Sequence, residues 1–205
     1  MTSYRKPDSR VRSQSQSQSV CPGFSKKCPT KSSCQVRLAA GPLAMTSTTL
    51  PRRNQGPRGR LSPQHRLRAV QGYTPEGEPF GEPGDQQGYY HWPGTSQMYS
   101  SARDMAIFLA ANLGELATEP SLRKAMASAQ QGVLPIGPRN LQAMAWEVLF
   151  GAGATIIEKY GGLHNASAYI GMMPDRKIGV VILGNRGNQY PHEIGRALLR
   201  ELSGP

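Results

Sequence analysis

The most regular pattern of apolar and polar positions lies in the last third of the chain. Residues 144–150 and 154–159 alternate or run apolar on either side of a glycine turn, which is typical of a β-hairpin. Residues 167–173 and 177–184 are apolar on both faces of the pleat, and Pro174 presets a turn between them. We therefore predict four antiparallel strands in this part of the chain.

Three other stretches have the apolar period of amphipathic helices. Residues 100–115 begin with serines that can cap a helix, and Asp104 lies in the first turn, where the helix dipole favours a carboxylate. We expect a shorter helix at 121–129 and a last one at 191–202, with a proline near its start. Helices on the faces of an antiparallel sheet predict the α+β fold class.

Charge and composition divide the chain into unlike parts. Residues 1–70 hold 14 Lys and Arg but a single acidic residue, a net charge of about +13, whereas residues 71–205 have about −2. Residues 1–40, rich in Ser, Gln, Lys and Arg, predict a disordered low-complexity basic segment. Residues 41–70 contain a short ordered island at 41–50 and an Arg/Pro-rich stretch, so we expect the folded domain at 71–205.

Several kinds of protein do not fit this composition. No apolar run is long enough for a membrane span, and the N-terminus lacks the apolar region of a secretory signal, so we expect a cytoplasmic location for the chain as written. The spacing of Cys21, Cys28 and Cys34 matches no usual zinc site. We therefore expect neither a metal nor a cofactor.

The candidate chemistry begins with Lys159, which stands directly before Tyr160 and a glycine pair. A lysine just inside the end of a buried strand keeps its ammonium at the sheet edge, where the glycines remove side-chain bulk. An acyl or carboxylate group could then lie along the strand, with the N–H of Gly162 directed at a developing oxyanion. The alternative interpretation is a solvated lysine before a Gly-Gly turn.

Five motifs stand in an order that resembles a known family: "PLAMTSTTL" (42–50), "GTSQMYSSARDMAIFLAANLG" (94–114), "MAWEVL" (144–149), "EKYGGLHNASAYIGMMPDRKIGVVILGNR" (158–186) and the last helix. Together they resemble class C serine β-lactamases and their D-alanyl-D-alanine peptidase and esterase relatives. The resemblance implies a β-lactamase/transpeptidase-like fold that is incomplete in this chain. A further strand and the helical domain would come from a missing half.

The resemblance also implies a substrate-binding edge. By their places in the motif, Lys159 takes the position of the lysine of the family's Lys-Thr-Gly box, Tyr160 that of its threonine and Gly161 that of its glycine. Gly162 takes the position of the oxyanion-binding residue. Asn185 and Asn188 fall in the Asn-rich turn after the next strand and are expected to face the cleft. Tyr160 departs from the pattern, because its bulky ring stands where the substrate carboxylate should rest.

The catalytic motifs of the family are not found in order. Its mechanism acylates a serine in a Ser-x-x-Lys turn, while that lysine and a Tyr-x-Asn tyrosine manage protons. Ser-x-x-Lys occurs at residues 3–6, in the tail expected to be disordered, and at 121–124, after the helix that it should precede in the family's order. Tyr-x-Asn does not occur. We therefore expect no catalytic residue and no turnover by this chain alone.

Two hypotheses remain open. In the first, the chain is the C-terminal part of a class C-type hydrolase, periplasmic when intact, whose small-molecule partner is a β-lactam or an acyl-D-Ala-D-Ala-like compound. The basic stretches would then be out-of-frame sequence. In the second, residues 1–70 are a basic arm that binds nucleic acid or an anionic surface, beside an inactive scaffold. A nucleic-acid partner is disfavoured because the arm lacks interleaved aromatic residues.

Overall fold

The computed structural model describes residues 39–50, 61–85, 98–151 and 154–204, and a single antiparallel sheet runs through most of this part. Its strand order is β1-β2-β3-β4-β5-β6, so each strand pairs with the next one along the chain. The strands are β1 (Leu134–Gly137), β2 (Asn140–Gln142), β3 (Glu147–Gly151), β4 (Ala154–Leu163), β5 (Ala166–Met173) and β6 (Ile178–Gly184). The helices are α2 (Pro63–Arg66), α3 (Ala102–Asn112), α4 (Pro120–Ala129) and α5 (Pro191–Leu202), with a 3-10 turn at Pro174–Arg176.

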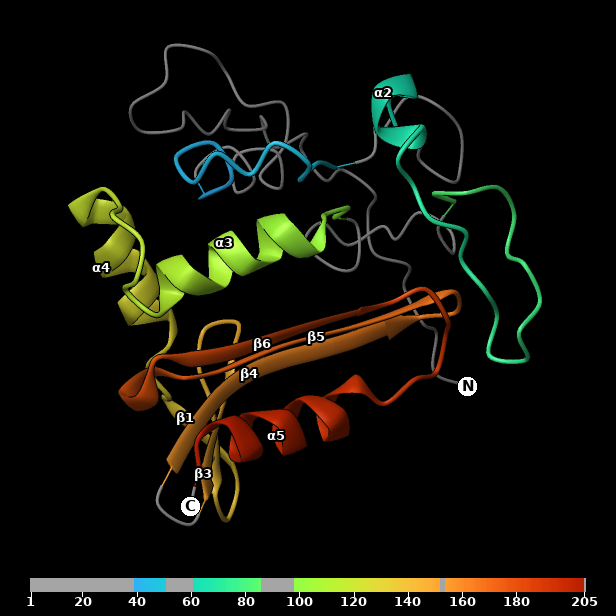
Figure 1. The fold of residues 1–205 in the computed structure, drawn as a ribbon. Helices are drawn as coiled ribbons and strands as arrows, with labels where there is room; N and C mark the ends of the chain where they lie inside the picture. The colour runs from blue at the N-terminus through green and yellow to red at the C-terminus, as the bar shows by residue number, and fades with distance from the viewer. Residues whose placement is uncertain (1–38, 51–60, 86–97, 152–153, 205) are drawn as a thin grey trace, which may run out of the picture.

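The predicted α+β layout is confirmed, with helices on both faces of the sheet. Figure 1 shows α3 above the sheet and α5 below it. On the α3 face, Leu109 packs with Trp146 and Met172, and a second cluster joins α3 to residues 40–45. On the α5 face, Leu199 packs with Tyr169 and Met173. Both faces of β5 are therefore covered, as its apolar sequence predicts.

The sequence predicts the last four strands but not β1 and β2. These two are short, and every residue of β1 is exposed, so neither carries a buried alternating pattern. The turn between β5 and β6 forms where Pro174 predicts it, and Lys177 adopts a left-handed conformation (φ 55°) to close it.

The strand predicted over residues 154–159 is longer in the structure, and the alternative interpretation of a Gly-Gly turn is wrong. The glycine pair after Lys159 is not a turn, because β4 continues through both glycines to Leu163 and turns only at 164–165. The register with β5 is regular from Ile157↔Met172 to Leu163↔Ala166. The glycines keep extended backbone and so remain in the strand.

The outer edge of β6 has no partner strand among the described residues. Beyond the end of β6, Asn185 O accepts the N–H of Tyr73 at 2.7 Å. Alternation then directs the backbone groups of Gly179, Val181 and Leu183 outward from the same edge. This open edge is where the further strand that the resemblance implies would pair.

Other expectations lie outside what the structure describes. The predicted disorder of the N-terminal segment falls on residues 1–38, which also include the three cysteines. Ala40, at the end of that segment, is buried against residues 43 and 45. Within the described ranges, no helix is long and apolar enough to cross a membrane.

Candidate functional site

The last five residues of β4 extend past the end of β3 and leave an open edge there. The orientation of this edge follows from a hydrogen bond on β3, where the N–H of Phe150 donates to Arg139 O at 2.9 Å on the β2 side. Alternate residues of a strand present their amides to opposite sides. Glu147 therefore faces β4, and its pairing partner Glu158 faces β3.

The same alternation, continued along the regular register of β4 with β5, shows which way the backbone groups of the candidate site residues point. Lys159 and Gly161 direct their backbone groups toward β5, whereas Tyr160 and Gly162 direct theirs outward. No described strand pairs with β4 on that side beyond Glu158. Among the described residues, none hydrogen-bonds to the N–H or C=O of Gly162, so a chain or an acyl group laid along the edge could bind there. The amide predicted as the oxyanion donor points in the direction that this role requires.

The Lys159 side chain is held by an acid on the neighbouring strand. Its Nζ donates to Oε1 of Glu147 at 2.7 Å, and its side chain is 48% exposed. Glu147 belongs to the "MAWEVL" strand of the sequence motif, so the register of β3 and β4 brings two of the predicted motifs together. The pair neutralises the lysine, which therefore does not present an uncompensated positive charge.

The Tyr160 ring lies on the opposite side of the sheet from Lys159. It stacks on His192 at the start of α5, with 4.3 Å between ring centroids and 23° between ring planes. Tyr190 meets His192 edge to face at 6.1 Å. The sequence predicts a bulky ring beside the edge but gives no sign of its partners, which lie some 30 residues further along the chain.

Two hollows flank the open edge. The larger, of about 1000 Å³, lies between α3, the segments around residues 40–50 and 61–72, and the sheet, with Met105, Phe108 and Ile170 in its wall. The smaller, of about 430 Å³, lies on the α5 side. Five of the six predicted residues line the larger hollow: Lys159, Tyr160, Gly161, Gly162 and Asn185. Tyr160, both glycines and Asn188 line the smaller one.

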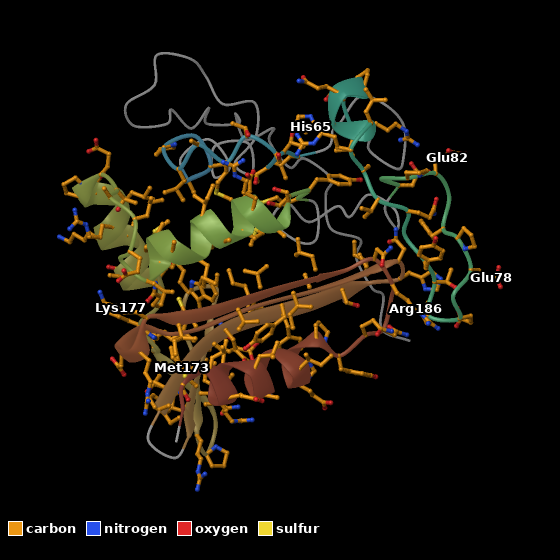
Figure 2. All side chains as sticks on the ribbon, in the orientation of Figure 1. His65, Glu78, Glu82, Met173, Lys177 and Arg186 are labelled. Atoms are coloured by element: carbon orange, nitrogen blue, oxygen red, sulfur yellow. The ribbon has the colours of Figure 1, made fainter. Side chains whose placement is uncertain are left out.

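The two asparagines have different surroundings. Asn185 uses its Nδ2 to donate to Gln71 O at 3.0 Å, so its side chain ties residues 71–73 to the end of β6. Asn188 has a left-handed backbone (φ 51°), which asparagine tolerates better than most residues. Nearby, Arg186 donates through Nε to Pro75 O at 3.0 Å, at the end of the sheet opposite Lys177 (Figure 2).

A buried ion pair supports the site from the α5 face, and the sequence reasoning missed it. Glu158 has no exposed side-chain surface, and Nε of Arg196 donates to both of its oxygens at 3.0 Å. Nη2 of Arg196 donates to the same carboxylate, which raises the pKa of Arg196. The Tyr169 hydroxyl also donates to Glu158, at 3.1 Å. The sequence does hold a sign of this ion pair, because Glu158 is the single charged residue inside the apolar run before Lys159.

The Tyr169 ring fits this position because glycines face it. Burial, and then the negative charge of Glu158, raise the pKa of the Tyr169 hydroxyl far above its ordinary value, so it stays a donor. A Cβ on Gly195 of α5 would lie 2.1 Å from the ring, so only glycine allows the helix this close to the sheet.

Asp104 anchors the segment that the sequence identifies as an ordered island. It is buried at the start of α3, and its Oδ2 accepts from the Ser47 N–H and the Thr48 hydroxyl, both at 2.8 Å. The predicted helix cap is also present, since the Asp104 N–H donates to Ser101 Oγ at 3.2 Å. Two motifs that lie more than 50 residues apart are thus joined in one wall of the larger hollow.

The described part of the chain holds no group of three or more His, Cys, Asp or Glu residues that could bind a metal. In the described part, the features that could bind a ligand are the open backbone edge of β4, the neutralised Lys159 and the two hollows.

Comparison with known proteins gives consistent results. The beta-lactamase family model matches residues 38–203. A beta-lactamase of Lysobacter lactamgenus is 28% identical over 149 residues, covering 57% of this chain and 37% of that protein. Solved structures with the same fold include a class C beta lactamase from Rhodobacter sphaeroides (TM-score 0.65, 20% identity, 81% of this chain and 52% of that chain). Another is the D-alanine carboxypeptidase AmpC from Burkholderia cenocepacia (TM-score 0.67, 24% identity, 84% and 54%). The chain thus spans about half of these structures and 37% of the curated relative.

Proposed function

Because the chain belongs to the beta-lactamase family, we propose that it forms the substrate-binding half of a serine acyl-transfer site of the class C type. A β-lactam or a related acyl compound binds along the open edge of β4. The serine that is acylated, and the groups that activate it, come from sequence that this chain does not hold in family order. The chain alone therefore binds without turnover.

The observation that carries this proposal is the direction of the Gly162 amide. Its N–H and C=O face outward from β4, beside Lys159 and without a partner strand among the described residues. A backbone N–H held in a strand is a preorganised donor for the oxyanion of a tetrahedral intermediate. The C=O of the same residue can accept an amide N–H of the substrate, which aligns the acyl group along the edge.

The geometry also supports a role for Lys159 in organising this edge. Because Glu147 neutralises its charge, Lys159 acts as a hydrogen-bond donor at the rim of the larger hollow and provides little net attraction for an anion. A neutral ester or amide is therefore as compatible with the edge as an anionic β-lactam. The names of two structural neighbours include D-alanine carboxypeptidase, and we keep peptide or ester hydrolysis as the second candidate function.

The hypothesis of a basic arm stays a prediction. Residues 1–38 and 51–60, which carry most of its charge, lie outside the described ranges. No feature of the described residues favours nucleic acid over a small acyl substrate.

Mass spectrometry after incubation with a penicillin tests the proposal directly. We expect no covalent adduct on the chain alone. We expect an adduct when the chain replaces the matching half of the Rhodobacter sphaeroides enzyme, and much slower formation with Lys159→Ala. Lys177→Ala is the matched control, because that exposed lysine lies at the far end of the sheet. An adduct on the chain alone, or equal rates for the two variants, would contradict the proposal.

The gene provides an independent test that does not depend on the folding of a hybrid protein. Read in all three frames, the DNA upstream of the "GPLAMTSTTL" codons should encode Ser-x-x-Lys followed by Tyr-x-Asn. Absence of both motifs in every frame would remove the support for a class C-type parent.

A further inference from the structure

The smaller hollow on the α5 side of the β4 edge contains no fixed charge. Its volume is about 430 Å³, and none of its lining residues is Asp, Glu, Lys or Arg. The described residues around it are Tyr160, the glycine pair, Leu163, His164, Asn188, Gln189, Tyr190, Pro191 and His192. Such a lining suits an uncharged ligand group, because a buried carboxylate without a charged partner is costly.

Aromatic rings dominate this hollow. Tyr160 is 41% exposed and Tyr190 is 68% exposed, so each ring has a free surface toward the hollow or its mouth. Both rings contact His192, one stacked and one edge to face, which holds them in a fixed mutual arrangement. Aromatic rings in such arrangements favour a further ring in stacked or edge-to-face contact.

Two cations close to the β4 edge are each paired with an acid. Glu147 holds Lys159 on the other side of the strand, and Glu158 holds Arg196 under the sheet. Neither cation lines the smaller hollow. Among the described residues that line the hollow, none supplies a Lys or Arg side chain to pair with a carboxylate.

The N-terminus of α5 does not supply the positive charge that the side chains lining the hollow lack. Pro191 opens the helix and has no N–H, while the N–H of Glu193 donates to Tyr190 O at 3.2 Å. The Glu193 carboxylate also lies in the first turn, where it offsets the positive end of the helix dipole. The usual attraction of a helix N-terminus for anions is therefore weak here.

The floor of the hollow gives access to the acyl-binding edge. An added Cβ on Gly162 would come no closer than 3.7 Å to any atom, so space for a ligand remains beside its backbone. The outward N–H of Gly162 is thus reachable by a carbonyl oxygen whose substituent enters the hollow.

We propose that this hollow is a specificity subsite for an uncharged aromatic substituent of the acyl substrate, with Tyr160 and Tyr190 as the residues that select it. The proposal rests on the proposed function and names a substrate class for it: aryl-substituted neutral esters or amides. At residue 160, where the resemblance places the substrate carboxylate, this hollow presents an aromatic ring stacked on His192.

Binding of three small probes to the full chain tests the subsite without any turnover. Benzamide carries a ring and a neutral carbonyl, benzoate carries the same ring with a charge, and acetamide has no ring. A nuclear magnetic resonance titration that follows the imidazole C–H signal of His192, assigned with a His192→Gln variant, reports contact at the subsite. We expect benzamide to bind with a dissociation constant on the order of millimolar. Benzoate should bind at least about five-fold more weakly, and acetamide should give no shift.

Two variants locate the binding. Tyr190→Ala should abolish the benzamide-induced shift, whereas Phe150→Ala should leave it unchanged, because that exposed ring lies on β3 outside both hollows. Benzoate binding as tightly as benzamide would overturn the proposal. So would benzamide affinity that survives Tyr190→Ala, since it would place the ring in the larger hollow. Failure of the acylation experiment leaves these binding results unaffected, so the two proposals fail separately.

Discussion

Replacing Arg196 with methionine tests whether the buried ion pair under the site stabilises the chain. Glu158 has no exposed side-chain surface, and Arg196 is its only cationic partner among the described residues. In Arg196→Met the carboxylate keeps one hydrogen bond, from the Tyr169 hydroxyl at 3.1 Å, but loses its countercharge. Removing one partner of a fully buried pair costs about 3–5 kcal/mol.

The expected cost lies at the lower end of that range, because the Arg196 side chain is 25% exposed and water can reach the space that it leaves. We expect the free energy of unfolding to fall by about 3 kcal/mol, measured as the shift of the urea midpoint multiplied by an unchanged slope. Arg200→Met is the control. It removes an exposed arginine from the same helix and should change stability by less than about 0.5 kcal/mol.

Neutralising the carboxylate should reverse the loss. In the double variant Glu158→Gln/Arg196→Met no buried charge remains, and the amide oxygen still accepts from Tyr169. We expect the double variant to be clearly more stable than Arg196→Met alone. A loss below about 1 kcal/mol, or a double variant no more stable than the single one, would refute the reasoning.

Three further predictions concern other parts of the described structure. Gly195→Ala should lower the free energy of unfolding by about 1–3 kcal/mol, because its Cβ would lie 2.1 Å from the Tyr169 ring; Gly161→Ala, with no atom within 4 Å, should be nearly neutral in the same urea titration. Burial raises the pKa of Tyr99 to about 12. Its folded-state pKa then exceeds the unfolded value, so stability should fall as the pH rises from about 10 through 12. Tyr99→Phe should make that fall less steep in chemical denaturation at several pH values. Glu147→Gln breaks an exposed ion pair and should cost at most about 1 kcal/mol. A larger loss in the same titration would show that the pair is more than a surface contact.

The strands, helices and open edge that carry strong local patterns could be predicted from the sequence. The "KIGVVILG" run, the proline turn before it and the last helix appear where their periods and turn residues place them. These features depend on neighbouring residues, which the sequence shows directly. The assignment of Lys159 and Gly162 to a substrate-binding edge rests on the sequence motif and stays a prediction.

What could not be predicted depends on contacts between distant parts of the chain. A Gly-Gly turn stayed open as an alternative because glycine weakens a strand locally, yet pairing with β5 keeps the pair extended. The partners of Tyr160 and Glu158 lie on α5, more than 30 residues away, and only the packing of that helix brings them close. β1 and β2 are too short and exposed to leave a pattern.

The alternation of β4 limits how this stretch of sequence can change in length. In β4 the Glu158 side chain faces α5, the Lys159 side chain faces α3 and the Gly162 amide faces outward. All three directions follow from one unbroken register along the strand, so they change together when its length changes. One inserted or deleted residue between Ile157 and Lys159 would move the lysine to the other face and turn the proposed oxyanion donor, the Gly162 amide, toward β5 at the same time. Homologous genes should therefore vary here by substitution, and insertions or deletions should fall elsewhere, as in the loop that joins β3 to β4.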